Sequence, residues 1–182
     1  MSAASRVFLL LTAAITLLAD TKCNCDPSQP ETLKERQCSL CIEAEKQPGG
    51  QAVFFLKDAN PRKPNRLLAL PRIHGTGLHR MVDLPAATQL ALWTAAIEKA
   101  RELFPQFDWG IAFNGDHVRT QCHTHLHIGR LLPGVETSNF IVVDNAAGIP
   151  PPTENGYWIH PIEAGKLHVH QGEQITETVL LR

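Results

Sequence analysis

Residues 121–128 read Gln121-Cys122-His123-Thr124-His125-Leu126-His127-Ile128, and histidines occupy three alternate positions in this stretch. Alternate side chains of an extended chain point to the same face of a sheet. The pattern therefore predicts a strand over residues 123–128 that presents three imidazoles in a row. Burying three titratable rings without partners is unfavourable, so the triplet indicates phosphate binding, metal binding or proton transfer.

The size and charge of the chain narrow this choice. It has 182 residues, of which 43% are hydrophobic, and this is enough for one compact domain. The formal net charge is -1, and Lys and Arg are scattered along the chain. This distribution excludes the basic field that drives binding to polymeric nucleic acid. A small or lipid-borne phosphate substrate is a better fit than DNA or RNA.

The N-terminal residues have the features of an export signal. Arg6 precedes an apolar run that ends at Ala19, and the run is shorter than the roughly 20 residues of a spanning helix. We expect residues 1–19 to be a signal peptide or an uncleaved N-terminal anchor of an exported protein, either periplasmic or extracellular. Residues 20–37 lack a hydrophobic period and predict an irregular arm. Residues 38–182 then form the domain.

The rest of the chain predicts an α+β fold in which an antiparallel sheet packs on one main helix. Apolar residues recur at helical spacing between Pro85 and Phe104, and Pro105 follows, so a helix is expected over residues 85–104. Besides the strand of the triplet, the expected strands cover residues 52–56, 66–70, 109–113, 139–143, 156–159, 166–170 and 175–181.

Two segments resemble the histidine triad superfamily of nucleotide hydrolases and transferases. One is the triplet with the polar loop that opens at Asn114-Gly115, and the other is Leu68-Ala69-Leu70-Pro71-Arg72-Ile73-His74. Within the superfamily the chain is similar to the bacterial CDP-diacylglycerol pyrophosphatases, in Leu56-Lys57-Asp58 and in Arg119-Thr120-Gln121 among other places. The resemblance covers about residues 38–130 and implies a histidine triad (HIT-like) fold for the domain.

The resemblance also implies roles for the triplet His123, His125 and His127 as catalytic residues. A neutral imidazole is a good nucleophile, and attack on the α-phosphorus divides one displacement into two easier ones. His125 matches the nucleophile of the family, and His127 is expected to contact the phosphate oxygens and the leaving group. The implied reaction is hydrolysis of a nucleotide phosphoanhydride, with CDP-diacylglycerol giving CMP and phosphatidate as the specific case. The alternatives are a hydrolase or nucleotidyltransferase acting on soluble nucleotides and a non-catalytic nucleotide-binding module.

Four further residues are expected to bind the substrate. Thr120 and Gln121 would donate hydrogen bonds to the charge that develops on phosphorus, and Asn114 would position the same phosphate. Asp58 matches the position that holds the ribose hydroxyls in the family. Arg130 is a candidate for a second phosphate by its charge. A lipid substrate also requires an apolar surface beside the site, for which the candidates are Trp109, Leu131, Leu132 and Phe140.

The spacing of Cys38 and Cys41 is typical of one side of a structural zinc site. The resemblance implies that His74 and His123 complete it, and the proposed chemistry requires no cofactor. The alternatives are a disulfide involving Cys38 or Cys41, because an exported protein meets an oxidising compartment, and free thiols. Cys23 and Cys25 offer further disulfide partners. Cys122 is expected to be a small buried residue.

A competing interpretation rests on His168-Val169-His170, which Glu173 follows. Such a pair can bind metal on a β-barrel strand, so a cupin-like metal protein is an alternative. Otherwise the pair lies on an exposed or edge strand near the site entrance. His79, His117 and His160 are expected in solvated loops. The resemblance further implies a homodimer, and a lipid substrate implies contact with a membrane surface.

Overall fold

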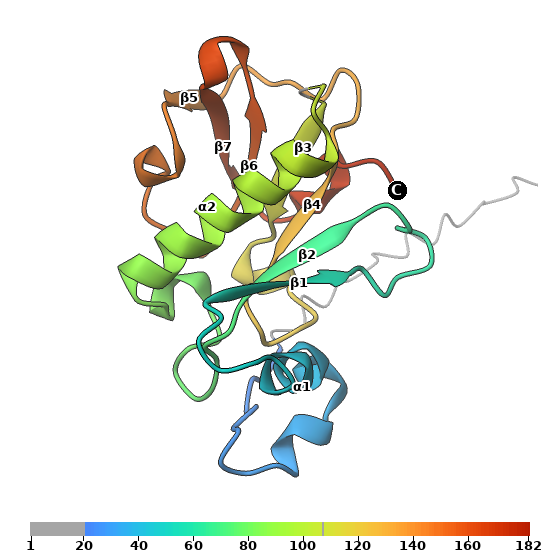
Figure 1. Cartoon of the computed structure of the whole chain (residues 1–182), viewed down its shortest axis with the longest axis vertical. Helices are drawn as coiled ribbons and strands as arrows, with labels where there is room; N and C mark the ends of the chain where they lie inside the picture. The colour runs from blue at the N-terminus through green and yellow to red at the C-terminus, as the bar shows by residue number, and fades with distance from the viewer. Residues whose placement is uncertain (1–20, 107) are drawn as a thin grey trace, which may run out of the picture.

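The computed structural model describes residues 21–106 and 108–182 (Figure 1). The signal segment expected at residues 1–19 lies outside this part of the chain. The strands are β1 Val53–Lys57, β2 Leu67–Pro71, β3 Trp109–Phe113, β4 Leu126–Arg130, β5 Phe140–Val143, β6 Gly156–Pro161 and β7 Leu167–Glu173. The α-helices are α1 Ser39–Glu45 and α2 Ala86–Leu103. Short 3-10 turns cover Thr32–Lys34, Arg36–Cys38, Met81–Asp83, Asp116–Val118, Ala146–Gly148, Glu163–Gly165 and Glu177–Val179.

The predicted α+β class with an antiparallel sheet and one main helix is confirmed. All seven strands form a single sheet in the order β1-β2-β4-β3-β6-β7-β5, and every pairing is antiparallel. β1 and β5 are the edges of this sheet, so the described strands do not close into the barrel that a cupin-like protein requires.

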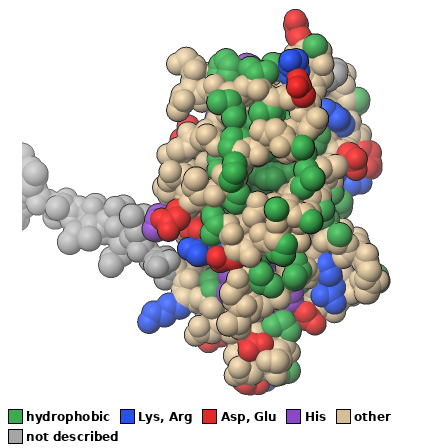
Figure 2. Space-filling view, turned by 90° about the vertical axis from the view of Figure 1, so that its left-hand side faces the viewer, with side chains coloured by type: hydrophobic (Ala, Val, Ile, Leu, Met, Phe, Trp, Pro, Cys, Tyr) green, Lys and Arg blue, Asp and Glu red, His purple; other side chains and the backbone are tan. Residues whose placement is uncertain are grey.

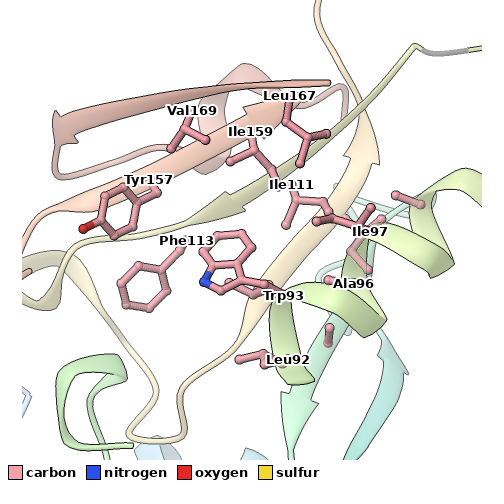
Figure 3. Packing of buried hydrophobic residues seen from close by; sticks show 14 of the residues in the cluster. Leu92, Trp93, Ala96, Ile97, Ile111, Phe113, Tyr157, Ile159, Leu167 and Val169 are labelled. Atoms are coloured by element: carbon pink, nitrogen blue, oxygen red, sulfur yellow. The ribbon is translucent and has the colours of Figure 1, made fainter. Parts of the chain in front are cut away.

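Helix α2 lies across one face of the sheet and forms the core with it (Figures 1 and 3). The buried residues of α2 recur at helical spacing and face a layer of sheet residues. On the helix these are Leu92, Trp93, Ala96, Ile97 and Ala100, and on the sheet they include Ile111, Phe113, Tyr157, Ile159, Leu167 and Val169. The helix ends before Pro105, in agreement with the prediction.

The opposite face of the sheet carries a row of paired residues from four neighbouring strands. His127 of β4 pairs with Ala112 of β3, Ala112 pairs with Trp158 of β6, and Trp158 pairs with His170 of β7. Because side chains alternate between faces, these four residues lie on the side away from Ile111 and Ile159, which pack against α2. This face therefore carries His127 of the triplet and the histidine pair of β7.

The N-terminal arm and α1 form a lobe below the sheet, drawn in blue in Figure 1. Two disulfides, Cys23–Cys122 and Cys25–Cys38, connect the arm to the rest of the chain, and Cys41 is a buried free thiol. These disulfides are compatible with an exported protein. Among the described residues, no helix is both long enough and apolar enough to cross a membrane.

Edge strand β5 exposes apolar side chains. Phe140, Ile141 and Val142 are among the exposed large hydrophobic residues of the described chain. Figure 2 shows the side of the molecule on which β5 and the start of α2 lie, and hydrophobic side chains gather over the middle of it. Edge strand β5 is therefore not protected by charged side chains against pairing with another strand.

Candidate active site

The histidine triplet does not lie on one strand. β4 begins at Leu126, so the strand expected over residues 123–128 is wrong for residues 123–125. The backbone N–H of Cys122 donates to the Gln37 carbonyl of the arm at 2.8 Å, and the Thr124 hydroxyl donates to the His79 carbonyl at 2.9 Å. The chain before β4 is therefore held by the arm and by a loop, and it makes no ladder with a neighbouring strand.

His125 has a fixed orientation. Its Nδ1 lies 2.8 Å from the carbonyl oxygen of His123, and a carbonyl can only accept, so Nδ1 carries the proton. In the neutral ring, Nε2 then holds the lone pair. Burial lowers the pKa of His125 below its ordinary value, and the Arg119 guanidinium lowers it further. The ring is therefore neutral at pH 7, with Nε2 as the reactive atom.

His127 lies beside His125, and their ring centroids are 4.9 Å apart. Its Nδ1 is 3.5 Å from a Glu177 carboxylate oxygen and 3.9 Å from an Asp58 carboxylate oxygen. Burial holds the pKa of His127 well below its ordinary value, and the neighbouring His125 and Lys63 add to this effect. Nδ1 makes no hydrogen bond with a described residue, so the single proton of the neutral ring can lie on Nε2 and donate to an oxygen of a bound phosphate.

These two histidines open into a pocket with a volume of about 440 Å³, a size typical of small-molecule sites. Six of the residues that the sequence assigns to catalysis or substrate binding line the pocket: Asp58, Asn114, Thr120, Gln121, His125 and His127. His123 and Arg130 do not line it. Its other polar lining residues are Arg36, Ser39, Asn60, Lys63, Arg119 and Glu177. Three cationic side chains thus accompany the histidines, which suits a substrate with more than one phosphate.

His123 faces a different neighbourhood. Its ring lies 5.3 Å from that of His74 and 6.3 Å from that of Phe54, measured between centroids. Its Nδ1 donates to the Thr124 carbonyl at 2.9 Å. Burial lowers the pKa of His123 to about 3, so this ring stays neutral. His123 therefore contributes to the site through its backbone carbonyl, which orients His125.

Asn114 holds the C-terminal segment against the pocket. Its side-chain oxygen accepts hydrogen bonds from the backbone N–H groups of Thr176, at 2.9 Å, and Glu177, at 3.0 Å. Gly115 makes the close approach of this segment feasible, because a Cβ there would lie 2.3 Å from Gln174 Oε1. The amide NH₂ of Asn114 remains as the group that can donate to a phosphate, as expected from the sequence.

Glu177 is a site residue that the sequence analysis missed. Its carboxylate contacts the Lys63 ammonium, and it lies 3.1 Å from Nη1 of Arg66, which is nearly buried. The strand expected over residues 175–181 is wrong: Glu177–Val179 is a 3-10 turn, and Leu180 makes only an isolated bridge to Leu131. Glu177 is 50 or more positions from the triplet and lacks a motif, so no sequence signal could have placed it.

The N-terminal arm forms one wall of the pocket, which the sequence did not indicate. Arg36 and Ser39 line it. The Ser39 hydroxyl donates to Gln121 Oε1 at 2.8 Å, and Gln121 Nε2 donates to the Arg36 carbonyl at 3.2 Å. One end of the Gln121 amide is thus bound by the first residue of α1 and the other by the arm, which fixes this side chain beside the triplet. Thr120, which precedes Gln121 in the same loop, also lines the pocket.

The expected zinc site at Cys38, Cys41, His74 and His123 is not assembled. Cys38 is bonded to Cys25, so it offers no thiolate. This bond confirms the alternative to zinc, a disulfide involving Cys38. Nε2 of His74 lies 2.6 Å from a Glu45 carboxylate oxygen. Burial raises the pKa of the Cys41 thiol to about 12. The residues present therefore do not fit a zinc ion with two Cys ligands. Cys122 is buried as expected, but it is bonded to Cys23.

The described residues contain two groups that could hold a metal. One consists of Cys25, Cys38 and Cys122, all of which are in disulfides. The other consists of Glu136, His160, His168 and His170, which lie outside the pocket of His125. Glu173, expected beside the pair, is not part of this group. His160 is buried in β6 and His79 is buried in its loop, so the expectation of solvated positions is wrong for both, while His117 is exposed.

The apolar residues proposed for a lipid substrate do not line the pocket. Trp109 is in the core with α2, Leu131 packs with Trp158, and Phe140 stacks on His168. Arg130 pairs with Asp108 at 2.8 Å and lines a separate hollow, so it does not reach the site. The apolar lining of the pocket consists of Leu40, Ala59, Leu68, Phe113 and Val118.

The geometry thus brings a neutral histidine with its lone pair on Nε2, a second histidine and cationic side chains into one pocket. Comparison of the chain with protein-family models and with curated proteins gives no match.

Proposed function

We propose that the chain hydrolyses a nucleotide phosphoanhydride through a covalent nucleotidyl intermediate on His125. The observation that carries this proposal is the 2.8 Å hydrogen bond from His125 Nδ1 to the His123 carbonyl. It directs the lone pair of Nε2 into a pocket with His127 and Lys63. A nucleophile oriented through its second nitrogen by a third group is the arrangement expected for covalent catalysis.

The reaction has two displacements. The lone pair of His125 Nε2 attacks the α-phosphorus, and the bond from phosphorus to the bridging oxygen breaks with its electron pair on the leaving phosphate. Water then attacks the same phosphorus, the P–N bond breaks with its electron pair returning to Nε2, and the proton lost by the water passes to solvent. His127 donates to the phosphate oxygens, while Lys63, Arg36 and Arg119 balance the negative charge that develops. These steps assign no role to a metal ion.

CDP-diacylglycerol, giving CMP and phosphatidate, is the specific substrate we propose. A second hollow of about 540 Å³ shares Lys63 and Glu177 with the pocket and carries Leu132, Leu180 and Leu181. This apolar lining beside the phosphate site would suit the start of an acyl chain. A soluble nucleotide hydrolase or nucleotidyltransferase is the alternative, since Asp58 and Asn60 offer polar contacts for a ribose without any lipid.

Intact-mass spectrometry tests the mechanism. Wild type and His125→Ala are exposed briefly to CDP-diacylglycerol, CDP, ADP or a sugar nucleotide, and the exposed His117→Ala is the matched control. We expect a nucleotidyl adduct on wild type and on the control only, and we expect turnover of His125→Ala to fall by at least about 10³-fold. Retained turnover in His125→Ala ends the proposal. Binding without product in wild type identifies a non-catalytic module instead.

The cellular setting is proposed on the same terms. An exported, periplasmic or extracellular enzyme would meet lipid-linked nucleotides at a membrane surface, and the two disulfides are compatible with that compartment. Vesicle sedimentation tests the membrane contact, and analytical ultracentrifugation tests the homodimer.

A further inference from the structure

A second histidine group lies on the same face of the sheet as His127, nearer the edge strand β5. It comprises His160 of β6, His168 and His170 of β7, and Glu136 of the segment between β4 and β5. One side-chain nitrogen or oxygen of each residue lies within 4.8 Å of those of the other three. None of these residues lines the pocket of His125, so the proposed hydrolysis does not account for them.

Strand pairing is the reason that these residues meet. His160 and His168 are direct partners across the β6 and β7 ladder. His170 is two residues farther along β7, so it points to the same face as His168. Leu167 and Val169, which alternate with them, are buried in the core on the other face. Two adjacent strands thus fix three imidazoles, and the segment after β4 adds the carboxylate.

The carboxylate of Glu136 faces all three rings. One oxygen lies 2.7 Å from His160 Nε2, and the other lies 2.8 Å from His168 Nδ1 and 3.6 Å from His170 Nε2. The Nε2 atoms of His160 and His170 are only 3.4 Å apart. Two imidazole nitrogens 3.4 Å apart that both face the same carboxylate need a shared proton or a shared cation.

Hydrogen bonds on the far sides of two rings orient the near nitrogens. His160 Nδ1 lies 3.1 Å from the Pro161 carbonyl, which only accepts, so Nδ1 carries the proton and Nε2 holds the lone pair. His170 Nδ1 lies 3.0 Å from the Thr137 hydroxyl, which leaves Nε2 toward Glu136. Metal-binding histidines are oriented by such contacts of their second nitrogen.

Aromatic packing fixes two of the rings as well. His170 stacks on Trp158 with centroids 3.6 Å apart, and His168 stacks on Phe140 with centroids 3.7 Å apart. The side chain of His170 is 2% exposed whereas that of Glu136 is 45% exposed. The group is therefore rigid on the sheet side and open on the side of Glu136, through which an ion could pass.

We propose that Glu136, His160, His168 and His170 bind a divalent first-row transition metal ion, with zinc as the first ion to test. Three imidazoles and one carboxylate form a donor set that suits zinc and its neighbours and does not suit calcium or magnesium. The ion would fasten the segment between β4 and β5 to β6 and β7. Three strand spacings separate His170 from His127, roughly 14 Å, so the ion would not touch the reacting phosphorus.

Metal titration of the full chain without a histidine tag tests this site. After treatment with a chelator, wild type, Glu136→Gln and His168→Asn are titrated with zinc by calorimetry, and cobalt(II) is used as an absorbance probe. The matched control is His117→Ala, because His117 also lies near a single carboxylate, 3.6 Å from Glu154, but on the exposed surface. Far-UV circular dichroism checks the fold of each variant.

We expect wild type and the control to bind one zinc ion per chain and to melt at a higher temperature with zinc. We expect the affinity of the two cluster variants to fall by at least about tenfold, a loss that even an outer contact of a metal ligand can cause. The proposal is overturned if wild type binds no zinc, or if the folded variants Glu136→Gln and His168→Asn bind it as tightly as wild type. Neither result affects the proposed hydrolysis, which His125→Ala tests.

Discussion

At the scale of single residues, a backbone carbonyl selects the reactive nitrogen of His125. The Nδ1 proton is held by the His123 carbonyl, and burial keeps the ring neutral. His127 is neutral for the same reason. As the proposed nucleophile, His125 would therefore require no deprotonation near pH 7, and only acid should switch it off.

The pH profile of kcat/KM should report the ionisation of His125. Because the pKa of His125 lies below its ordinary value of 6.5, the acid limb of this profile should lie below pH 6.5. Arg119→Gln removes a nearby positive charge and should move the limb to higher pH, whereas Arg119→Lys should not. The rates are measured with a substrate that lacks a terminal phosphate, so that its own ionisation does not contribute. An acid limb above pH 6.5 would contradict the assignment.

At the scale of elements, the loop after β3 and the C-terminal segment form one unit through Asn114. Two backbone N–H groups donate to its amide oxygen, and Glu177 is thereby placed 3.5 Å from His127. The loop thus has a structural role in addition to any contact with substrate. A pair of substitutions can separate the two roles.

Asn114→Ala should lower the free energy of unfolding by about 1–3 kcal/mol, because it leaves two partly buried donors without an acceptor. Asn114→Asp keeps an acceptor and should retain most of the stability. It loses the NH₂ donor and adds a negative charge, so its kcat should fall by about 10²-fold. Urea denaturation and steady-state kinetics measure the two effects. Full activity of Asn114→Asp would restrict Asn114 to holding the segment.

The sequence predicts elements well where periodicity decides them. Helix α2 and the buried strands follow from their apolar pattern, because core packing imposes it. It fails at residues 175–181, where β-branched and apolar residues suggest a strand but the Asn114 side chain accepts from the backbone N–H groups of Thr176 and Glu177. His125 and His127 could be found because they form one motif of three alternating histidines with His123. Glu177 and Arg36 could not, since only the folded chain brings them to the pocket.

At the scale of the whole molecule, the two disulfides connect the arm to the domain. Cys23–Cys122 spans 99 residues, and Cys25–Cys38 spans 13. A longer closed loop restricts the unfolded chain more strongly. The sulfur atoms of Cys25, Cys38 and Cys122 lie within 4.8 Å of one another, so a single replacement would leave a thiol able to exchange. The two members of a bond should therefore be replaced together.

The double variant Cys23→Ser with Cys122→Ser should lose about 2–4 kcal/mol of unfolding free energy. Dithiothreitol should destabilise wild type at least as much, because it also reduces Cys25–Cys38. Cys41→Ala, which removes the free thiol, is the control and should keep the sensitivity of wild type to the reductant. Urea denaturation with and without dithiothreitol measures these differences. An unchanged midpoint of wild type in reductant would contradict the pairing.

Cys122 is the residue directly before His123, whose carbonyl orients the nucleophile. The bond to Cys23 thus fastens the loop of the proposed nucleophile at its start, and such bonds form and persist in oxidising compartments. On the proposed function, a newly made chain would stay latent among the cell's own nucleotides. Its catalytic competence would be acquired on arrival, so that secretion itself would serve as the activating step.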